Sequence, residues 1–157
     1  MRVLQLNQNK AFTAALELNR TLVGSQEYLC LVTEPYKNKC RIASRPDGSS
    51  VLVTKSTTPP RVAIFYKGNF EILMIDSLSN EDCVVGVLRD GGSSFILASV
   101  YLDINKEVTP AWLTAVCEFA EEKGWPLLLG MDSNAHSTLY GPDMNACLLY
   151  TSDAADD

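Results

Sequence analysis

The sequence has a single histidine, and its five cysteines are widely spaced without a paired motif. A metal site built from several histidines is therefore excluded, and neither a zinc site nor a disulfide framework is supported. No apolar run is long enough to cross a membrane, and the N-terminus lacks the apolar stretch of a secretory signal. These absences predict an intracellular protein with no membrane span, and the nucleus is one compartment that this prediction allows.

What the sequence does contain is the composition of a globular domain. Hydrophobic residues make up 46% of the 157 residues and charged residues 20%, which is the usual balance for a soluble fold. The length suits one domain with a substantial core. No internal repeat, linker or low-complexity segment divides the chain, so we expect a single domain.

The acidic C-terminus is set apart from this domain. Residues 147–157 resemble the translation of a transposase-type sequencing adapter, and we expect them to be a non-native tail. The alternative is a frayed acidic terminus. Without Asp153, Asp156 and Asp157 the formal charge of −6 becomes −3, and either interpretation keeps the tail out of the functional argument.

Hydrophobic periodicity predicts alternating strands and helices of an α/β fold. Helices are expected at residues 10–23 and from Pro110, with Thr109 as its N-cap, to a stop at Gly124. Three leucines in a row at 127–129 predict a strand buried on both faces. The run of adjacent strands in the middle of the chain favours antiparallel or mixed pairing. The expected strands are residues 3–7, 28–32, 51–53, 61–66, 71–75, 83–89, 94–102 and 127–129.

Polar residues recur where these strands end, and together they form a plausible site. Asp132 and Asn134 are two residues apart, so in an extended backbone their side chains share a face. Clustered carboxylate and amide oxygens can hold a hard cation, or a phosphate through one. The alternatives are ordinary turn chemistry for Asp132 and Asn134, a solvated loop position for Glu34 and a half-buried strand aromatic for Tyr101. The candidate site residues are Asn7, Glu34, Tyr101, Asp132 and Asn134.

In this order along the chain, these residues resemble the endonuclease/exonuclease/phosphatase superfamily. The segments 4–7, 34–36 and 132–137, followed by Gly141, are similar to the apurinic-type endonuclease domain of non-LTR retrotransposons. The resemblance covers residues 1–146 and implies the N-terminal part of such a domain. It implies a DNase I-like layered α/β sandwich of two mixed or antiparallel sheets flanked by helices, with an incomplete second half.

The resemblance also implies a metal-dependent phosphodiesterase site. Glu34 would bind Mg²⁺ or Mn²⁺ with help from Asn7, Tyr101 would contact the scissile phosphate, Asp132 would orient the attacking water, and Asn134 would hold phosphate. The Ser-Asp-His motif that carries the family's catalytic histidine occurs nowhere in the chain. His136 belongs to a different segment, so we interpret it as structural or substrate-side, and we expect the chain as given to be inactive or feebly active.

The partner implied by the resemblance is DNA, within a longer polyprotein that also carries a reverse transcriptase. Four basic residues support a nucleic-acid surface directly after Glu34: Lys37, Lys39, Arg41 and Arg45. The alternative is a solvated surface loop. At the level of function, the alternatives are a phosphatase or phosphodiesterase of the same superfamily, and a non-catalytic relic or binding module.

Overall fold

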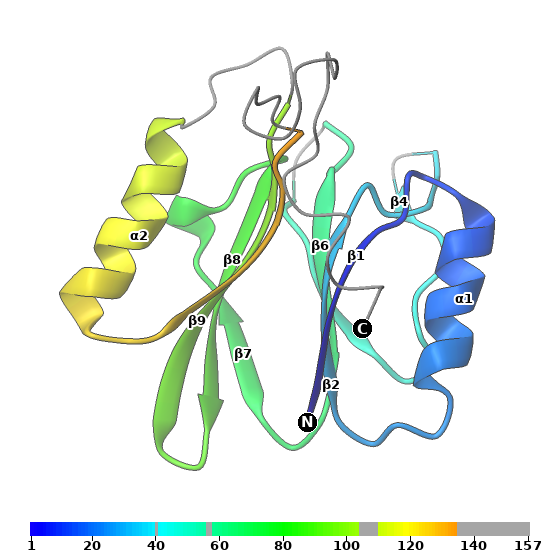
Figure 1. Ribbon diagram of the computed structural model, residues 1–157, viewed down its shortest axis with the longest axis horizontal. Helices are drawn as coiled ribbons and strands as arrows, with labels where there is room; N and C mark the ends of the chain where they lie inside the picture. Colours follow the sequence, from blue (N-terminus) through cyan, green and yellow to red (C-terminus); the bar gives the residue numbers. More distant parts are fainter. Residues whose placement is uncertain (40, 56–57, 104–109, 135–157) are drawn as a thin grey trace, which may run out of the picture.

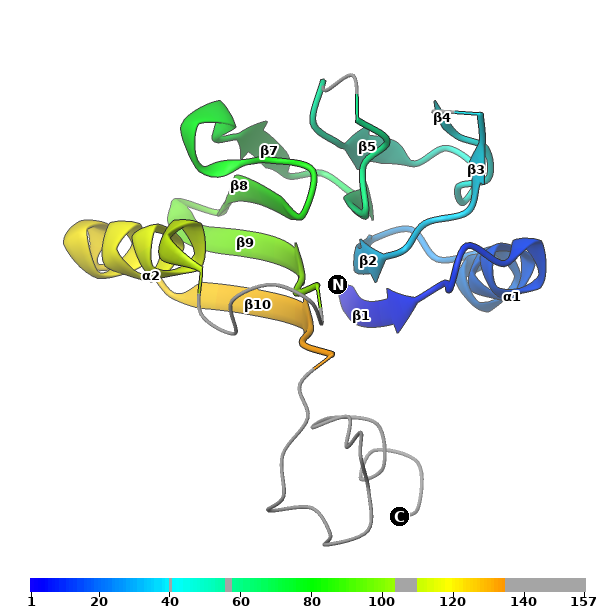
Figure 2. The same cartoon turned by 90° about the horizontal axis from the view of Figure 1, so that it is seen from above.

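The computed structural model describes residues 1–39, 41–55, 58–103 and 110–134. Two four-stranded sheets face each other, with one helix against the outer face of each (Figures 1 and 2). The strands of the first sheet, in spatial order, are β1 (Arg2–Asn7), β2 (Tyr28–Thr33), β6 (Val62–Lys67) and β5 (Ser50–Leu52). Those of the second are β10 (Leu127–Asp132), β9 (Ser93–Tyr101), β8 (Cys83–Asp90) and β7 (Glu71–Met74).

Both sheets are mixed, as the sequence predicts. In each, one pair is parallel, β1 with β2 and β10 with β9, and the remaining pairs are antiparallel. A parallel pair needs a crossover connection, which α1 (Phe12–Leu22) and α2 (Ala111–Lys123) provide. The two parallel pairs end at the same side of the sandwich, where Asn7 at the end of β1 bonds Asp132 at the end of β10, and this is where the candidate site lies.

Strand β2 shows how the sequence produces the layers. Every residue of this strand is buried, because its alternating side chains enter two different cores. Leu29 and Leu31 pack between the sheets, whereas Tyr28, Cys30 and Val32 pack beneath α1. A third core lies between α2 and the outer face of the second sheet.

The sheets approach each other closely near the end that carries the polar residues. Gly130 lies against Leu31 of the other sheet, where a Cβ added to the glycine would come within 2.6 Å of the Leu31 Cβ. The buried Ser99 hydroxyl donates to the Val32 carbonyl at 3.1 Å, and the Gln5 amide donates to the Met131 carbonyl at 2.8 Å. These contacts hold the ends of β1, β2, β9 and β10 together.

The strand at 127–129 is not buried on both faces, contrary to the sequence prediction. Within the described residues β10 pairs only with β9, and Leu128 is 37% exposed. Strand β1 is the corresponding edge of the first sheet, and its Val3 is 48% exposed. Leu127 and Leu129 pack against the core beneath α2, so the run is covered on that face only, and Leu128 on the other face stays partly exposed.

We expect Val3→Lys and Leu128→Lys to raise the protein concentration at which aggregation begins. Charges on exposed apolar edge strands oppose edge-to-edge pairing between copies. Light scattering against concentration measures the effect. Val23→Lys is the matched control, because it adds the same charge at an apolar residue that is 81% exposed at the end of α1. An equal gain from this control would show that net charge and not the strand edges governs aggregation.

Other boundaries agree with the sequence to within a few residues, with three differences. Pro110 is the N-cap of α2 and not its first residue, and Thr109 lies outside the described residues. Gly124 ends this helix in the left-handed conformation, with φ of 61°, as expected for a residue without a Cβ. Residues 37–60, for which the sequence predicts mostly loop with a short strand at 51–53, also contain a short hairpin, β3 (Lys37–Asn38) and β4 (Arg41–Ile42). The segment η1 (Asp76–Leu78) is a single turn of 3₁₀ helix. No helix in the described ranges is long and apolar enough to span a membrane.

Candidate functional site

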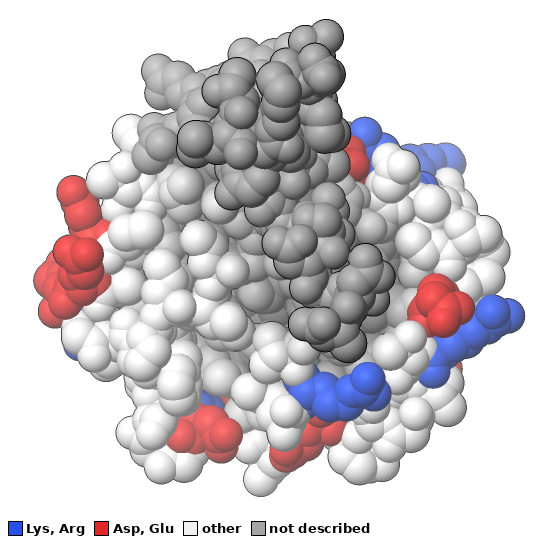
Figure 3. All heavy atoms as spheres, viewed as in Figure 1, with Lys and Arg blue, Asp and Glu red and all other residues white. Residues whose placement is uncertain are grey.

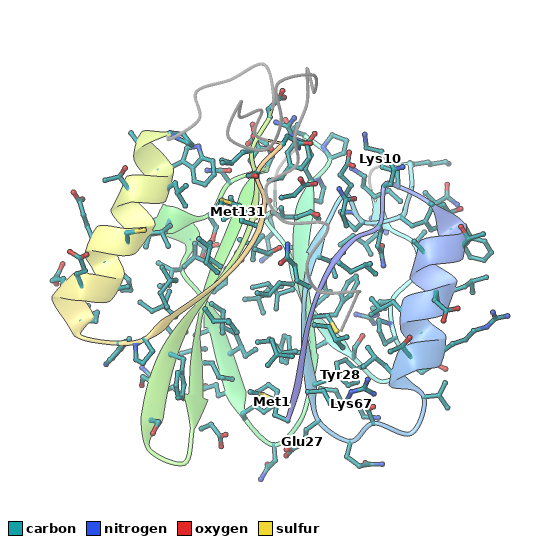
Figure 4. The ribbon with its side chains drawn as sticks, viewed as in Figure 1. Met1, Lys10, Glu27, Tyr28, Lys67 and Met131 are labelled. Carbon is teal, nitrogen blue, oxygen red and sulfur yellow. The ribbon has the colours of Figure 1, made fainter. Side chains whose placement is uncertain are left out.

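Four of the predicted site residues lie at the same end of the sandwich. Asn7 is the last residue of β1, and Glu34 follows directly after β2. Tyr101 and Asp132 are register partners at the ends of β9 and β10. Figure 4 marks this end by Lys10, in the turn after β1, and by Met131 of β10, whereas Met1, Glu27 and Tyr28 mark the opposite end.

The two sheets are joined at this end by a side-chain hydrogen bond. The Asn7 Nδ2 donates to the Asp132 Oδ2, although the two residues are 125 positions apart in the chain. The Asn7 Oδ1 accepts the backbone N–H of Asn9 at 2.6 Å, which fixes the orientation of the amide. Asp132 is 1% exposed. The structure therefore holds this carboxylate in one orientation.

Glu34 lies in a backbone conformation that few side chains adopt. Its φ is 46°, in the left-handed region, which costs a residue with a Cβ roughly 1 kcal/mol. Backbone hydrogen bonds hold it there: its N–H donates to the Arg61 carbonyl at 2.7 Å and its carbonyl accepts the Lys10 N–H at 2.8 Å. Strain that the surroundings enforce is common at functional sites.

Lys10 forms an ion pair with Glu34 that sequence reasoning missed. The Lys10 Nζ lies 2.9 Å from the Glu34 Oε1, and the carboxylate side chain is only 12% exposed. This hydrogen bond is the main reason that the Lys10 pKa is raised. Only its position shortly after the strand-end Asn7 could have drawn attention to it. The solvated-loop alternative for Glu34 is wrong, since its side chain is mostly buried and paired.

The electrostatics of Tyr101 show how closely the charges gather around it. Burial raises the Tyr101 pKa most, and the charges of Glu34, Asp103 and Asp132 raise it further, because an anionic phenolate is disfavoured beside carboxylates. The Arg61 guanidinium lies 4.9 Å from the ring centroid and acts in the opposite direction. Tyr101 is therefore a neutral hydroxyl at pH 7, placed among groups from both sheets.

Asn134 is held differently from Asp132. Strand β10 ends at Asp132, and Asn134 has a φ of 44°, so the extended geometry that would put both side chains on one face does not continue. The Asn134 Nδ2 donates to the Leu102 carbonyl at 3.0 Å. Leu102 lies 32 positions earlier in the chain, so this is a long-range bond and not the local turn bond that the sequence left open, and it places Asn134 beside the end of β9.

The residues present fit a hydrated divalent cation better than a dehydrated one. In the described part of the chain no three Asp, Glu, Cys or His side chains come together as ligands. Mg²⁺ needs no such set, because it keeps several waters and binds one or two carboxylates together with substrate phosphate. Among the described residues, three buried polar atoms near this end lack a hydrogen-bond partner and suit ordered water: Gln8 Nε2, Thr33 Oγ1 and Ser133 Oγ.

The predicted basic surface follows the site directly. Lys37 and Arg41 lie on the β3–β4 hairpin, Lys39 and Arg45 are exposed, and the Lys37 ammonium donates to the Pro60 carbonyl at 2.9 Å. Figure 3 shows Lys and Arg side chains at the upper right, where Figure 1 places β4, and acidic side chains at the left, where α2 lies. On this face, basic side chains thus gather beside β4 and acidic ones beside α2, although the net charge is −6.

Sequence reasoning also missed the residues that support the site. Arg61 and Asp82 pair through two hydrogen bonds between the start of β6 and the segment before β8, and Gln8 accepts the Tyr36 N–H at 2.9 Å. No sequence signal distinguishes them, because each lies beside a strand end like many other polar residues. His136 and residues 147–157 lie outside the described residues.

We compared the chain and its fold with known proteins. No family model matches the chain, and no curated protein matches it. Among solved structures it is similar to "Endonuclease domain of TRAS1, a telomere-specific non-LTR retrotransposon", with a TM-score of 0.66 and 23% identity. The match covers 89% of this chain and 62% of that one. The chain therefore has the fold of that endonuclease domain over less than two thirds of its length, and the predicted two-sheet sandwich is confirmed.

Proposed function

We propose that the chain is the N-terminal part of a metal-dependent DNA endonuclease that nicks its target, within a larger retrotransposon protein that also carries a reverse transcriptase. The fold it shares with a retrotransposon endonuclease domain supports this proposal. The observation that carries it is the Asn7–Asp132 hydrogen bond between the sheets, with Glu34 and Tyr101 at the same end.

Each residue has a role that its contacts suit. Asp132 orients the attacking water, and the Asn7 amide holds its carboxylate in place. Tyr101, kept neutral by burial and by nearby carboxylates, donates its hydroxyl to the scissile phosphate. Asn134 also contacts phosphate, from the position that its bond to the Leu102 carbonyl defines.

Glu34 is the carboxylate best placed to hold Mg²⁺ or Mn²⁺, with the side-chain oxygen of Asn7, Oδ1, as a neutral ligand. The chemistry that such a cation supplies is neutralisation of the charge that develops on the phosphate. The Lys10 ammonium contacts one oxygen of the Glu34 carboxylate, Oε1. A cation would therefore bind the other carboxylate oxygen or displace Lys10.

Slow nicking of supercoiled plasmid tests the proposal. With the chain in excess, Mg²⁺ or Mn²⁺ should convert plasmid to the open circle, and EDTA should stop the reaction. Because the chain has no Ser-Asp-His motif, we expect a rate ~10²- to 10⁴-fold below that of a complete domain. Phosphate release from a small ester without nicking would indicate a phosphatase, and metal-independent DNA binding without turnover would indicate a binding module; either result overturns the proposal.

Glu34→Gly should lose metal binding while keeping the fold. Glycine relieves the left-handed strain at φ of 46°, worth roughly 1 kcal/mol, and this offsets the lost Lys10 ion pair, worth up to about 1 kcal/mol because Lys10 is 61% exposed. Mn²⁺ binding by electron paramagnetic resonance and thermal denaturation measure the two effects. Lys39→Gly is the control, since it relieves a similar φ of 57° on the basic hairpin. Undiminished Mn²⁺ binding in Glu34→Gly would remove Glu34 as the ligand.

Lys39→Ala and Arg41→Ala should each weaken duplex DNA binding at every sequence tested. Each lost phosphate contact reduces the slope of log K against log salt by about 1. Fluorescence anisotropy of a labelled duplex over a range of salt concentrations measures it. Lys123→Ala is the matched control, because Lys123 ends α2, which lies on the opposite side of the molecule from β4 (Figure 1). If Lys123→Ala loses as much DNA affinity as the two hairpin variants, the hairpin has no special role in DNA binding.

A further inference from the structure

Arg61 connects the two halves of the candidate site through its backbone. Its carbonyl accepts the N–H of Glu34 at 2.7 Å, and its own N–H donates to the Glu81 carbonyl at 2.8 Å. Glu34 follows the first sheet's strand β2, whereas Glu81 lies just before β8 of the second sheet. One residue at the start of β6 therefore ties the strained Glu34 turn to the opposite sheet.

The Arg61 side chain engages two carboxylates in a fixed geometry. Its Nε and Nη2 both bind Asp82, the latter at 2.6 Å, and its Nη1 binds Asp103 at 2.7 Å. A guanidinium is planar and its donors are rigidly spaced, so this double attachment fixes the plane of the group. Asp82 is 5% exposed, and its pairing is the reason that so polar a cluster is tolerated at the interface between the sheets.

The same guanidinium lies over the ring of Tyr101. The distance from the guanidinium carbon to the ring centroid is 4.9 Å, within the range of a cation–π contact. The backbone N–H of Tyr101 donates to the Asp82 carbonyl at 2.8 Å. Arg61 and Asp82 together thus hold Tyr101 by its ring and by its backbone.

Arg61 also sets the charge around the site. Four acidic side chains gather at this end: Glu34, Asp82, Asp103 and Asp132. Lys10 balances Glu34, and Arg61 is shared between Asp82 and Asp103. Without Arg61, two further carboxylates would repel an incoming phosphate and any hydroxyl or water ordered near it.

We propose that Arg61, held by Asp82 and Asp103, is a positioning residue for phosphodiester cleavage: it fixes the Tyr101 ring against the scissile phosphate and the Glu34 turn against the opposite sheet. The inference rests on the proposed function. It assigns Asp82 and Asp103 to Arg61 and not to the cation. Arg61 acts through Tyr101 and Glu34, so its loss should affect the rate of the chemical step more than the binding of DNA.

The test compares Arg61→Met and Arg61→Lys with the parent chain of 157 residues. Tyrosine labelled with ¹³C gives a resonance for Tyr101, assigned by its loss in Tyr101→Phe. In Arg61→Met this resonance should move, kcat for plasmid nicking should fall by about 10²-fold, which is the cost of misplacing a group by about 1 Å, and KM should change less than kcat. Arg61→Lys, which keeps a cation near both carboxylates, should recover part of the rate.

Arg89→Met is the matched control. Arg89 pairs with Glu71 at 3.9 Å, is 56% exposed and lies at the far end of β8, so the same substitution there should move neither the Tyr101 resonance nor kcat. If Arg61→Met does not fold, Asp103→Asn removes the negative charge of one of the guanidinium's partners at a more exposed position, and the same changes are expected with a smaller magnitude.

The outcomes separate this inference from the proposed function. An unmoved Tyr101 resonance in Arg61→Met and Asp103→Asn, or a raised KM with kcat unchanged, overturns the positioning role while leaving the nuclease intact. An absence of nicking by the parent chain and by a version extended to a complete domain overturns the proposed function, and with it the catalytic part of the inference. The resonance would still report whether Arg61 holds Tyr101.

Discussion

Gly130→Ala is expected to lower the free energy of unfolding by about 3 kcal/mol, at the upper end of the usual range for overpacking. The added Cβ would lie 2.6 Å from both the Cβ and the Cδ1 of Leu31, and Leu31 is 2% exposed in the core between the sheets. The Leu31 Cβ cannot rotate away, so the sheets themselves must separate. Urea denaturation followed by circular dichroism measures the loss.

The double variant Gly130→Ala/Leu31→Ala identifies the cause. Leu31→Ala alone should cost ~2 to 5 kcal/mol through the cavity it leaves, but it also removes the Cδ1 and Cγ that the new methyl group meets. The two losses should therefore fall short of additivity by more than about 0.5 kcal/mol. Strict additivity would mean that the loss comes from the contact with the Leu31 Cβ, which alanine keeps, and not from the contacts with Cγ and Cδ1.

Asp132→Asn is expected to reduce metal-dependent nicking by ~10²- to 10⁴-fold, the usual contribution of a group that activates water by accepting its proton. Asparagine has the same shape, and its carbonyl oxygen can still accept the Asn7 amide hydrogen bond. The loss should therefore be one of charge and not of fold. Single-turnover conversion of supercoiled to open-circular plasmid, together with the melting temperature, measures both.

Asp47→Asn controls for the loss of one negative charge, because Asp47 is exposed and lies away from the strand ends that form the site. It should leave nicking and stability unchanged. The assay must resolve a tenfold change in rate, which corresponds to about 1.4 kcal/mol in the activation free energy. If Asp132→Asn then nicks plasmid within about threefold of the parent rate, the assignment of Asp132 is contradicted.

The secondary structure was largely predictable because it depends on local periodicity. The apolar runs at β2, β6, β8 and β9 appear where the sequence predicts strands, and Gly124 ends α2 as expected. The predictions failed where a neighbour decides the outcome. Leu128 is partly exposed although Leu127 and Leu129, on the other face of β10, pack against the core beneath α2, and no local pattern reports which face of a strand is covered.

The candidate site shows the same division. Asn7, Glu34, Tyr101 and Asp132 were identifiable because each is a polar residue at a strand end, and the structure brings these four together. Their partners were not identifiable. Lys10 and Arg61 stand in the sequence as ordinary basic residues, and only the fold places one on Glu34 and the other between Asp82 and Tyr101.

The sequence by itself determined which segments are strands and helices, and which oxygen-bearing side chains end them, because alternation and capping act over a few residues. Only the tertiary structure decided that the ends of four strands from two sheets meet, and that Gly130 lets those sheets approach. It also decided that the side chains of Lys10 and Arg61 pair with carboxylates gathered there. The physical reason is range: hydrogen bonds and ion pairs between residues as far apart as Asn7 and Asp132 exist only after the sheets have packed.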